Sequence, residues 1–345
     1  MGISIVIPVY NVEAYIADCI QSVIWQTYSD SLECVLVDDC GTDRSMSIAE
    51  EMIAEYNGPI DFRLVHHDQN RGLSAARNTG VDVSTGDYVY FLDSDDWISD
   101  DCIEKLTKPL QQEKYDIVVG DYEMVGTLPY FLELSLPEGR YHEKGISKTF
   151  CNQGVYVMAW NKLYRKDFLV ENRLRFDEGR VHEDELLAFD LSCLEKSFYV
   201  VKSVTYFYRI RKNSIITSDD KRRKLEGYLG AFQSVREKVM KYGRLDGIYD
   251  LYLFNIRKVF GWISGLELDE DMLGRVEDQT KGYLDVIPSL FCLQNKHDKL
   301  VFFMCKKDQT FSRYQYVTTE FEDKLQGRVL RNVLKMFPKK QVVLD

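Results

Sequence analysis

The sequence lacks any run of about 18 uncharged apolar residues, which is the length that a helix needs to cross a lipid bilayer. It also lacks a basic leader, because an apolar segment starts directly at Ile3. Both absences argue against a secreted or membrane-spanning protein, and we expect a cytoplasmic one. With 45% hydrophobic and 29% charged residues, the composition is that of an ordinary globular protein.

Positive charge is scarce: 44 Lys and Arg stand against 55 Asp and Glu, which gives a net charge of −11. Nucleic-acid binding needs concentrated Lys and Arg, so this balance argues against a nucleic-acid partner. An acidic enzyme can still hold an anionic nucleotide if a divalent cation neutralises its phosphates.

Three local patterns are missing. None of the eight cysteines belongs to a C-x-x-C pair, so we expect buried free thiols rather than a zinc site or disulfides. Neither G-x-G-x-x-G nor G-x-x-x-x-G-K-[ST] occurs in the sequence. The sequence basis for a dinucleotide oxidoreductase or a P-loop NTPase is therefore absent.

The first third of the chain alternates short apolar runs with segments of helical periodicity. Runs of β-branched or aromatic residues predict strands, and apolar residues at helical spacing predict helices between them. The predicted strands are Ile3–Val9, Leu32–Val37, Phe62–Val65 and Tyr88–Leu92, and the predicted helices are Val12–Gln26, Ser45–Tyr56 and Ser74–Val83. This order is typical of βαβ units with a mostly parallel sheet.

Polar and acidic residues follow each predicted strand. They are Tyr10-Asn11, Asp38-Asp39, His66-His67-Asp68 and Asp93-Ser94-Asp95-Asp96. Ligands bind at the carboxyl ends of strands in open α/β sheets, so we expect a site at this edge. For Asp38 and Asp39, capping of the helix that begins near Asp43 is the structural alternative.

The strongest single feature is the acidic block Asp93–Asp96 after the apolar segment Tyr88–Leu92. Carboxylates two residues apart at a strand end can point toward one divalent cation and its phosphate ligands. The pattern also suits a phosphatase of the haloacid dehalogenase type, although that family carries its motif on the first strand and not on the fourth.

Four blocks, Ser4–Asn11, Val37–Asp43, Asn70–Gly80 and Asp93–Asp96, resemble in order and spacing the signature blocks of the family 2 inverting glycosyltransferases. The likeness covers about the first 110 residues, and weaker echoes at Trp160–Tyr164, Glu183-Asp184 and Tyr208-Arg209 extend it to about residue 215. It implies a GT-A fold, an α/β domain with a mostly parallel central sheet flanked by helices.

The resemblance also implies roles for individual residues on the donor side. Tyr10 would flank the uracil of a UDP-sugar, and Asp39 would accept a hydrogen bond from the base N–H. Asp95 and Asp96 would bind Mn²⁺ or Mg²⁺ beside the diphosphate. The other implied donor-binding residues are Pro8, Asn11, Glu13, Arg71, Arg77, Asp93 and Ser94. For the two arginines, an ion pair with the acidic edge is the alternative.

An inverting transfer needs one general base to deprotonate the acceptor hydroxyl. The resemblance selects Asp184, with Glu183 beside it, as the catalytic pair. Acidic residues also favour the first turn of a helix, which is the structural alternative for this pair. His182, directly before it, either helps to bind the acceptor or is structural.

Beyond about residue 218 the sequence changes to charged amphipathic helices, Lys221–Tyr242 and Tyr249–Leu266. We therefore expect a catalytic domain at 1–218, with a nucleotide-binding half at about 1–110 and an acceptor half at about 111–218, and a mainly helical region at 219–345. Basic and apolar residues alternate from Arg328 to Lys340. This pattern suits peripheral contact with the inner face of the cell membrane, a solvated helix or a homodimer contact.

The expected function is an inverting, metal-dependent transfer from a UDP-sugar to a carbohydrate or lipid-linked glycan acceptor. By resemblance, the product is a bacterial surface glycan such as a capsule, an exopolysaccharide or a lipopolysaccharide. The Q-x-x-R-W motif of processive synthases is absent, which favours single additions. The alternatives are a metal-dependent phosphatase or nucleotidyltransferase, and a non-catalytic nucleotide-sugar binding protein.

Overall fold

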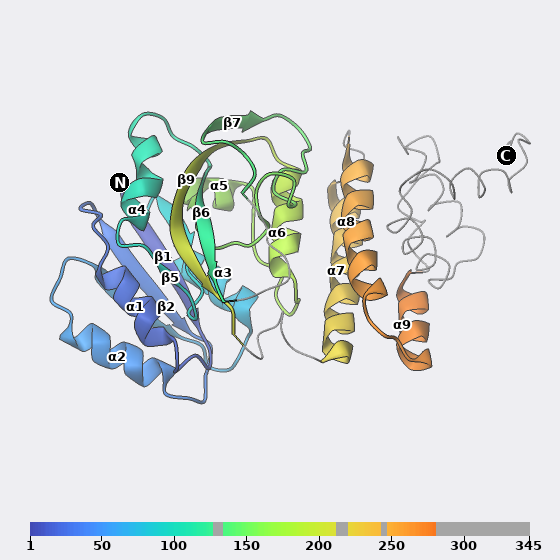
Figure 1. Ribbon diagram of the computed structural model, residues 1–345, viewed down its shortest axis with the longest axis horizontal. Helices are drawn as coiled ribbons and strands as arrows, with labels where there is room; N and C mark the ends of the chain where they lie inside the picture. Colours follow the sequence, from blue (N-terminus) through green and yellow to red (C-terminus); the bar gives the residue numbers. More distant parts are fainter. Residues whose placement is uncertain (127–133, 212–219, 243–246, 281–345) are drawn as a thin grey trace, which may run out of the picture.

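The computed structural model describes residues 1–126, 134–211, 220–242 and 247–280. Within these ranges the strands form one nine-stranded sheet in the order β3-β2-β1-β4-β8-β6-β9-β5, with β7 paired to β9. Figure 1 shows helices α1 and α2 against one part of the sheet and helices α6 to α9 beyond its other part.

The N-terminal half is a parallel βαβ arrangement, as expected. Its strands are β1 (Ile3–Val9), β2 (Leu32–Asp38), β3 (Asp61–His66) and β4 (Tyr88–Phe91), and its helices are α1 (Ile16–Ile24), α2 (Ser45–Glu55) and α3 (Leu73–Val83). β1 pairs in parallel with both β2 and β4, and all seven of its residues are buried. A strand covered on both faces reads as a continuous apolar run, which explains the sequence ISIVIPV.

The second half of the sheet mixes both strand directions. Its elements are β5 (Trp97–Ile98), α4 (Cys102–Thr107), η1 (Lys108–Gln111), β6 (Ile117–Val125), β7 (Gly139–Glu143), β8 (Lys162–Arg165), α5 (Lys166–Glu171), α6 (Glu183–Ser192) and β9 (Lys196–Arg209). β8 runs antiparallel to β4 and β6, whereas β6 and β9 are parallel. β8 thereby joins the two halves into one sheet.

Most predicted elements are confirmed within a few residues, but the helix expected from Val12 begins only at Ile16. The N–H of Val12 donates to Ser45 Oγ (2.8 Å), and that of Glu13 donates to Asp43 Oδ2 (2.8 Å). These two hydrogen bonds tie residues 12–15, which form a turn before α1, to the start of α2.

Three helices follow the sheet: α7 (Lys221–Tyr242), α8 (Ile248–Ser264) and α9 (Glu270–Thr280). Their apolar residues form a second core cluster together with α6, whose Leu186 and Phe189 are fully buried in it. The predicted boundary near residue 218 falls between β9 and α7 and stays a prediction. The basic segment Arg328–Lys340 lies outside the described residues, and so do the predicted membrane and dimer contacts.

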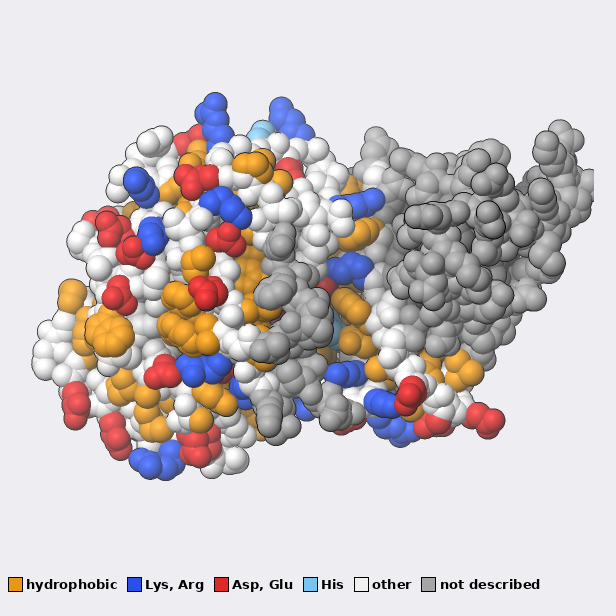
Figure 2. Space-filling view, in the orientation of Figure 1, with side chains coloured by type: hydrophobic (Ala, Val, Ile, Leu, Met, Phe, Trp, Pro, Cys, Tyr) orange, Lys and Arg blue, Asp and Glu red, His pale blue; other side chains and the backbone are white. Residues whose placement is uncertain are grey.

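The surface of the α/β part carries charges of both signs. In the space-filling view, acidic and basic side chains are interspersed over the face that it presents (Figure 2). The six cysteines within the described ranges are free, and all except Cys40 are buried. Among the helices that the structure describes, none is long and apolar enough to span a membrane.

Candidate active site

The carboxyl ends of β1, β2 and β4 meet at one edge of the sheet. In the parallel registers Val9 lies opposite Asp38 and Val6 lies opposite Phe91. The residues that follow these strands, Tyr10, Asp39 and Asp93, are thereby brought to a common edge. Pro8 directly precedes Val9 in β1, where it is buried opposite Val37.

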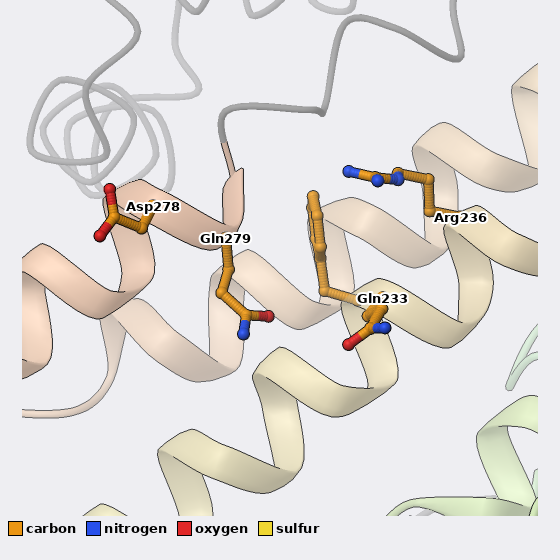
Figure 3. A pocket seen from close by; sticks show the side chains of 5 residues that line it. Gln233, Arg236, Asp278 and Gln279 are labelled. Carbon is orange, nitrogen blue, oxygen red and sulfur yellow. The ribbon is translucent and has the colours of Figure 1, made fainter.

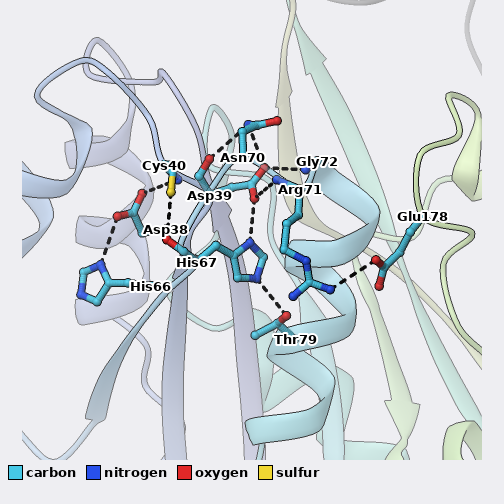
Figure 4. Close-up of polar contacts among 10 residues, drawn as sticks. All are labelled: Asp38, Asp39, Cys40, His66, His67, Asn70, Arg71, Gly72, Thr79 and Glu178. Atoms are coloured by element: carbon cyan, nitrogen blue, oxygen red, sulfur yellow. Dashed lines mark hydrogen bonds and ion pairs between the residues drawn. The ribbon is translucent and has the colours of Figure 1, made fainter.

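Asp39 holds the loop that leads into α3 (Figure 4). Its Oδ1 accepts a hydrogen bond from the backbone N–H of Arg71 (2.8 Å) and pairs with His67 Nδ1 (2.7 Å). Its Oδ2 accepts hydrogen bonds from Gly72 N (2.8 Å) and Asn70 Nδ2 (3.0 Å). Because both oxygens are engaged by protein donors, a hydrogen bond from a nucleotide base would have to displace one of them.

His67 and Gly72 explain how this loop keeps its shape. The second ring nitrogen of His67 pairs with Thr79 Oγ1 (2.9 Å), which connects the loop to α3. Gly72 has φ 88°, a left-handed conformation that only glycine adopts without strain. The sequence assigned no role to His67, and its place directly after a strand was the signal that could have found it.

The turn after β1 presents one exposed ring above two anchored polar residues. Tyr10 is 48% exposed, so its ring is accessible to a ligand. Asn11 has φ 51°, and its Oδ1 accepts a hydrogen bond from Thr42 N (2.7 Å). Glu13 Oε2 accepts one from Arg44 N (3.0 Å). These side chains fix the turn against the chain that enters α2.

Arg77 is the buried centre of the site. It projects from α3, is 1% exposed, and forms ion pairs with Asp93 (2.8 Å), Glu183 (2.9 Å) and Asp184 (3.0 Å). Burial acts to lower the pKa of Arg77, but the three carboxylates outweigh it and raise the pKa, so the guanidinium stays charged. The acidic block after β4 and the pair at the start of α6 are thus joined through one cation.

Asp184 lies where burial makes its carboxylate more basic. Burial raises the pKa of Asp184 to about 7; Arg77 opposes the rise, whereas Glu183 and Asp93 add to it. The Asp184 side chain is 19% exposed, and a largely desolvated carboxylate with a pKa near the working pH is suited to accept a proton. Glu183 and Asp184 also occupy the first turn of α6, where the helix dipole favours acidic residues.

Within the acidic block the aspartates have different surroundings. Asp96 is fully buried; its Oδ2 accepts a hydrogen bond from the hydroxyl of Tyr206 (2.6 Å) and its Oδ1 one from the backbone N–H of Arg209 (2.7 Å). Asp95 instead forms an ion pair with Arg211. Ser94, which directly precedes Asp95, is 6% exposed.

Asp95 fits a divalent cation better than Asp96 does. Burial and the neighbouring charge of Asp93 raise the pKa of Asp95, so a cation placed there would relieve both penalties. Asp96 is fully buried and held by Tyr206 and Arg209, whereas Asp95 is partly exposed and would exchange its ion pair with Arg211 for the cation. In the described part of the chain no group of three or more His, Cys, Asp or Glu side chains could hold a metal. A cation at Asp95 would therefore take further oxygen ligands from substrate phosphates, as Mg²⁺ often does.

Arg71 and two residues of β9, Tyr206 and Arg209, also belong to the candidate site. The side chain of Arg71 is 44% exposed and pairs with Glu178 (3.3 Å), so it remains accessible to an anionic ligand. Tyr206 and Arg209, which hold the acidic block, lie on β9, more than 100 residues further along the chain. No local pattern in the sequence identified Tyr206 as a partner of Asp96.

A pocket of about 410 Å³ lies elsewhere, between α7 and α9. Figure 3 shows Gln233, Arg236, Asp278 and Gln279 around it, and Phe232 completes its lining. Among the residues that the structure describes, its lining holds one carboxylate, Asp278, and not the paired acidic residues found at the edge of the sheet.

Comparison with solved structures identifies the architecture. The chain superimposes on S. aureus TarS 1-349 in complex with UDP-GlcNAc with a TM-score of 0.77 and 17% identity, covering 94% of this chain and 92% of that one. A mannosyltransferase from Pyrobaculum calidifontis, PcManGT, in complex with GDP-Man and Mn²⁺, gives a TM-score of 0.54 and 16% identity over 93% of this chain and 87% of that one. The predicted GT-A fold is confirmed.

Sequence comparison gives the family. A profile described as Glycosyl transferase family 2 matches residues 4–172. An uncharacterized glycosyltransferase of Haemophilus influenzae is 31% identical over 258 residues, covering 73% of this chain and 94% of the relative. The chain belongs to glycosyl transferase family 2.

Two longer relatives share only part of their length with this chain. The glycosyltransferase GlyA of Streptococcus pneumoniae is 38% identical over 225 residues, which is 62% of this chain and 31% of GlyA. The minor teichoic acid biosynthesis protein GgaB of Bacillus subtilis is 29% identical over 222 residues, which is 61% of this chain and 23% of GgaB. The chain therefore spans less than a third of either relative.

Proposed function

We propose that this chain is an inverting, non-processive, metal-dependent glycosyltransferase that moves a sugar from a UDP-sugar to a carbohydrate acceptor in the synthesis of a surface glycan. The observation that carries the proposal is the buried network around Arg77. The guanidinium of Arg77 pairs both with Asp93, in the acidic block suited to a nucleotide diphosphate, and with the carboxylate pair Glu183-Asp184.

Asp184 is the proposed general base. In an inverting transfer the acceptor oxygen bonds to the anomeric carbon while the bond from that carbon to the diphosphate oxygen breaks. The acceptor proton passes to the carboxylate of Asp184, and the electron pair of the broken bond leaves with UDP. Burial raises the pKa of Asp184 to about 7, which gives this carboxylate a basicity suited to neutral pH.

On the donor side, Tyr10 offers an exposed ring for the uracil, and Pro8, Asn11 and Glu13 shape the turn beneath it. Asp39 supports the pocket by fixing the loop at residues 70–72, and it would bind the uracil N–H only by exchanging one of its present donors. Arg71 is accessible to the diphosphate.

At the acidic block, Asp93 is proposed to hold the ribose, with the buried Ser94 shaping this part of the pocket. Asp95 is proposed to hold Mn²⁺ or Mg²⁺, with Asp96 as the residue that anchors the block to β9. A cation bound there would stabilise the negative charge that develops on the leaving diphosphate.

The comparisons support the donor class and the glycan context. TarS has a related fold in complex with UDP-GlcNAc, and PcManGT has one with GDP-Man and Mn²⁺. GgaB is named for teichoic acid biosynthesis. Single addition is proposed because the sequence lacks the Q-x-x-R-W motif of processive synthases.

The test separates donor binding from transfer by substituting one aspartate on each side of Arg77. Asp95→Asn should weaken Mn²⁺-dependent UDP binding and transfer together, because the cation loses a charged ligand. Asp184→Asn should lower transfer by about 10²–10⁴-fold, the usual contribution of a general base, with little change in UDP affinity. Calorimetry with UDP, with and without chelator, and nucleotide release from UDP-sugars measure the two effects.

Asp82→Asn is the matched control, since Asp82 forms an ion pair on the surface with Arg175. It should leave both quantities unchanged. An active Asp184→Asn enzyme would refute the base assignment and make Glu183 the next candidate. Equal UDP affinity with and without metal would refute the role of Asp95. Release of phosphate from simple esters without UDP binding would identify a phosphatase, and donor binding without transfer or hydrolysis would identify a binding protein.

A further inference from the structure

Three aromatic rings from three different helical segments meet beside the carboxylate pair. His182 lies directly before α6, Tyr228 lies on α7, and Trp262 lies on α8. The ring centroids are 4.8 Å apart for His182 and Tyr228, 4.9 Å for His182 and Trp262, and 5.1 Å for Tyr228 and Trp262. We call these residues the ring cluster. α6 lies beside α7 and α8 in Figure 1, as these contacts require.

His182 is held in a conformation that its own backbone does not favour. It has φ 66° and ψ 35°, the left-handed region, where residues other than glycine are strained. Its carbonyl accepts hydrogen bonds from the N–H groups of Glu185 (3.1 Å) and Leu186 (3.3 Å) and so begins α6. Burial and Lys258 lower the pKa of His182 to about 4, so the ring packs as a neutral imidazole at neutral pH. Such strain persists only where the surroundings impose it.

The same two helices also contact α6 through charged groups. Lys258 on α8 forms an ion pair with Glu185, in the first turn of α6. Lys238 on α7 pairs with Asp190 (2.6 Å), whose other oxygen accepts a hydrogen bond from the hydroxyl of Tyr242 (2.8 Å). Both ends of α6 are therefore fixed against the helices α7 and α8.

Glu183 and Asp184 are the two residues that follow His182. Their side chains form ion pairs with Arg77 on α3. A shift of His182 would move both carboxylates relative to Arg77, because they share one helical turn with it. A displacement of about 1 Å at a catalytic group can cost about 10²-fold in rate.

We propose that α7 and α8 position the general base: Tyr228 and Trp262, by packing on His182, set where Asp184 lies against Arg77. The helices beyond the segment matched by the family profile thereby become part of the working site. The identification of Asp184 as the base rests on the function proposed above, but the positioning of its carboxylate does not.

The titration of Asp184 reports this positioning. The charged and titratable groups around it are Arg77 on α3, Asp93 after β4, Lys162 and Tyr164 on β8, and Glu183 on its own helix. Burial is the largest cause of its raised pKa. If the ring cluster is disrupted, water reaches the start of α6. Because burial outweighs the opposing effect of Arg77, the pKa of Asp184 then falls from about 7 toward its ordinary value of 3.8 even where the pair with Arg77 weakens.

The experiment uses the full chain with Trp262→Leu, which keeps an apolar side chain but removes the ring. Trp262→Phe restores a ring, and Met240→Ala is the control, because Met240 on α7 is 69% exposed. The Asp184 carboxyl is titrated by ¹³C NMR in aspartate-labelled protein and identified by the signal that Asp184→Asn removes. In Trp262→Leu the midpoint should fall by at least about one pH unit, and kcat should fall by about tenfold or more with an unchanged KM for the UDP-sugar.

Trp262→Phe should recover most of both effects, and Met240→Ala should show neither. An Asp184 midpoint and a kcat that are unchanged in Trp262→Leu would overturn the proposal. Parallel losses of kcat and UDP affinity without a shifted midpoint would also overturn it, because they indicate a general structural defect. If wild-type protein transfers no sugar, the proposed function fails, while the NMR midpoint still decides the positioning. Should Trp262→Leu not fold, Tyr228→Leu serves in the same experiment.

Discussion

At the scale of single residues, the charge balance around Arg77 decides the chemistry of the site. One buried guanidinium faces three carboxylates, and a second cation, Lys162, is also buried near Asp184. Burial lowers the pKa of Lys162 well below its ordinary value, so this lysine contributes less positive charge than its type suggests. Burial, reinforced by the negative charges of Glu183 and Asp93, makes the carboxylate of Asp184 basic.

The rate of transfer should depend on pH through Asp184. Its pKa is raised to about 7, so below this pH the carboxyl is protonated and cannot accept the acceptor proton. We expect kcat/KM to rise with pH through about 7 and to fall about tenfold per pH unit on the acid side, because kcat/KM reports the base of the free enzyme.

Initial rates between about pH 5.5 and 8 measure this fall of kcat/KM on the acid side, which we call the acid limb. The acid limb should be absent from the residual activity of Asp184→Asn, and a kcat/KM that does not change with pH in the wild-type enzyme would contradict the assignment. Asp82→Asn, the surface control, should keep the wild-type limb.

At the scale of elements, the placement of Arg77 depends on how closely α3 lies on β1. Gly80, one turn beyond Arg77 in α3, faces Val6: a Cβ at this position would meet Val6 Cγ1 at 2.2 Å. Since such a contact cannot be accommodated without movement, the absence of a side chain at residue 80 sets the separation of helix and strand. That separation brings Arg77 under the carboxyl ends of the strands.

Gly80→Ala should therefore destabilise the protein by about 1–3 kcal/mol, the usual cost of overpacking a core. Gly274→Ala in α9 is the matched control, because a Cβ there meets nothing within 4 Å. Alanine favours a helix over glycine by about 1 kcal/mol, so the control should be neutral or stabilising. Thermal unfolding followed by circular dichroism compares the two variants, and equal melting temperatures would show that α3 can move away from β1.

At the scale of the whole molecule, two apolar cores meet at α6. The sheet and its helices form the larger core, whereas α7, α8 and α9 form the smaller one together with Leu186 and Phe189 of α6. The helix that carries Glu183 and Asp184, the proposed catalytic pair, is thus stabilised from the C-terminal side.

A cavity in the smaller core should therefore loosen α6. Leu229 on α7 is 3% exposed, and Leu229→Ala should cost about 2–5 kcal/mol. Hydrogen exchange measured by mass spectrometry should then accelerate in α6 and α7, with little change in β1 to β4. The exposed Met240→Ala variant should exchange like the wild type. Unchanged protection of α6 in Leu229→Ala would mean that the sheet alone supports it.

The amino-acid pattern alone predicts the α/β architecture and the sheet edge at which the proposed site lies. Runs such as Ile3–Val9 and Lys221–Tyr242 coincide with β1 and α7, because apolar periodicity reflects which face of an element is buried. The acidic residues that follow β2 and β4 meet because parallel strands end at one edge of the sheet. Cys40 illustrates the limit of this local reasoning. It is not a glycine, yet its φ of 58° is a conformation that glycine favours.

The polar groups that are already paired with other protein groups are known only from the folded structure. Asp39 and Asp96 read as ligand-binding residues in the sequence, yet their oxygens accept hydrogen bonds from residues 70–72 and from β9. Arg77 joins carboxylates that lie 16 and more than 100 residues away in the chain. The pairing of buried charges depends on distances and desolvation that arise only once distant segments pack together, and for that reason no local pattern contains it.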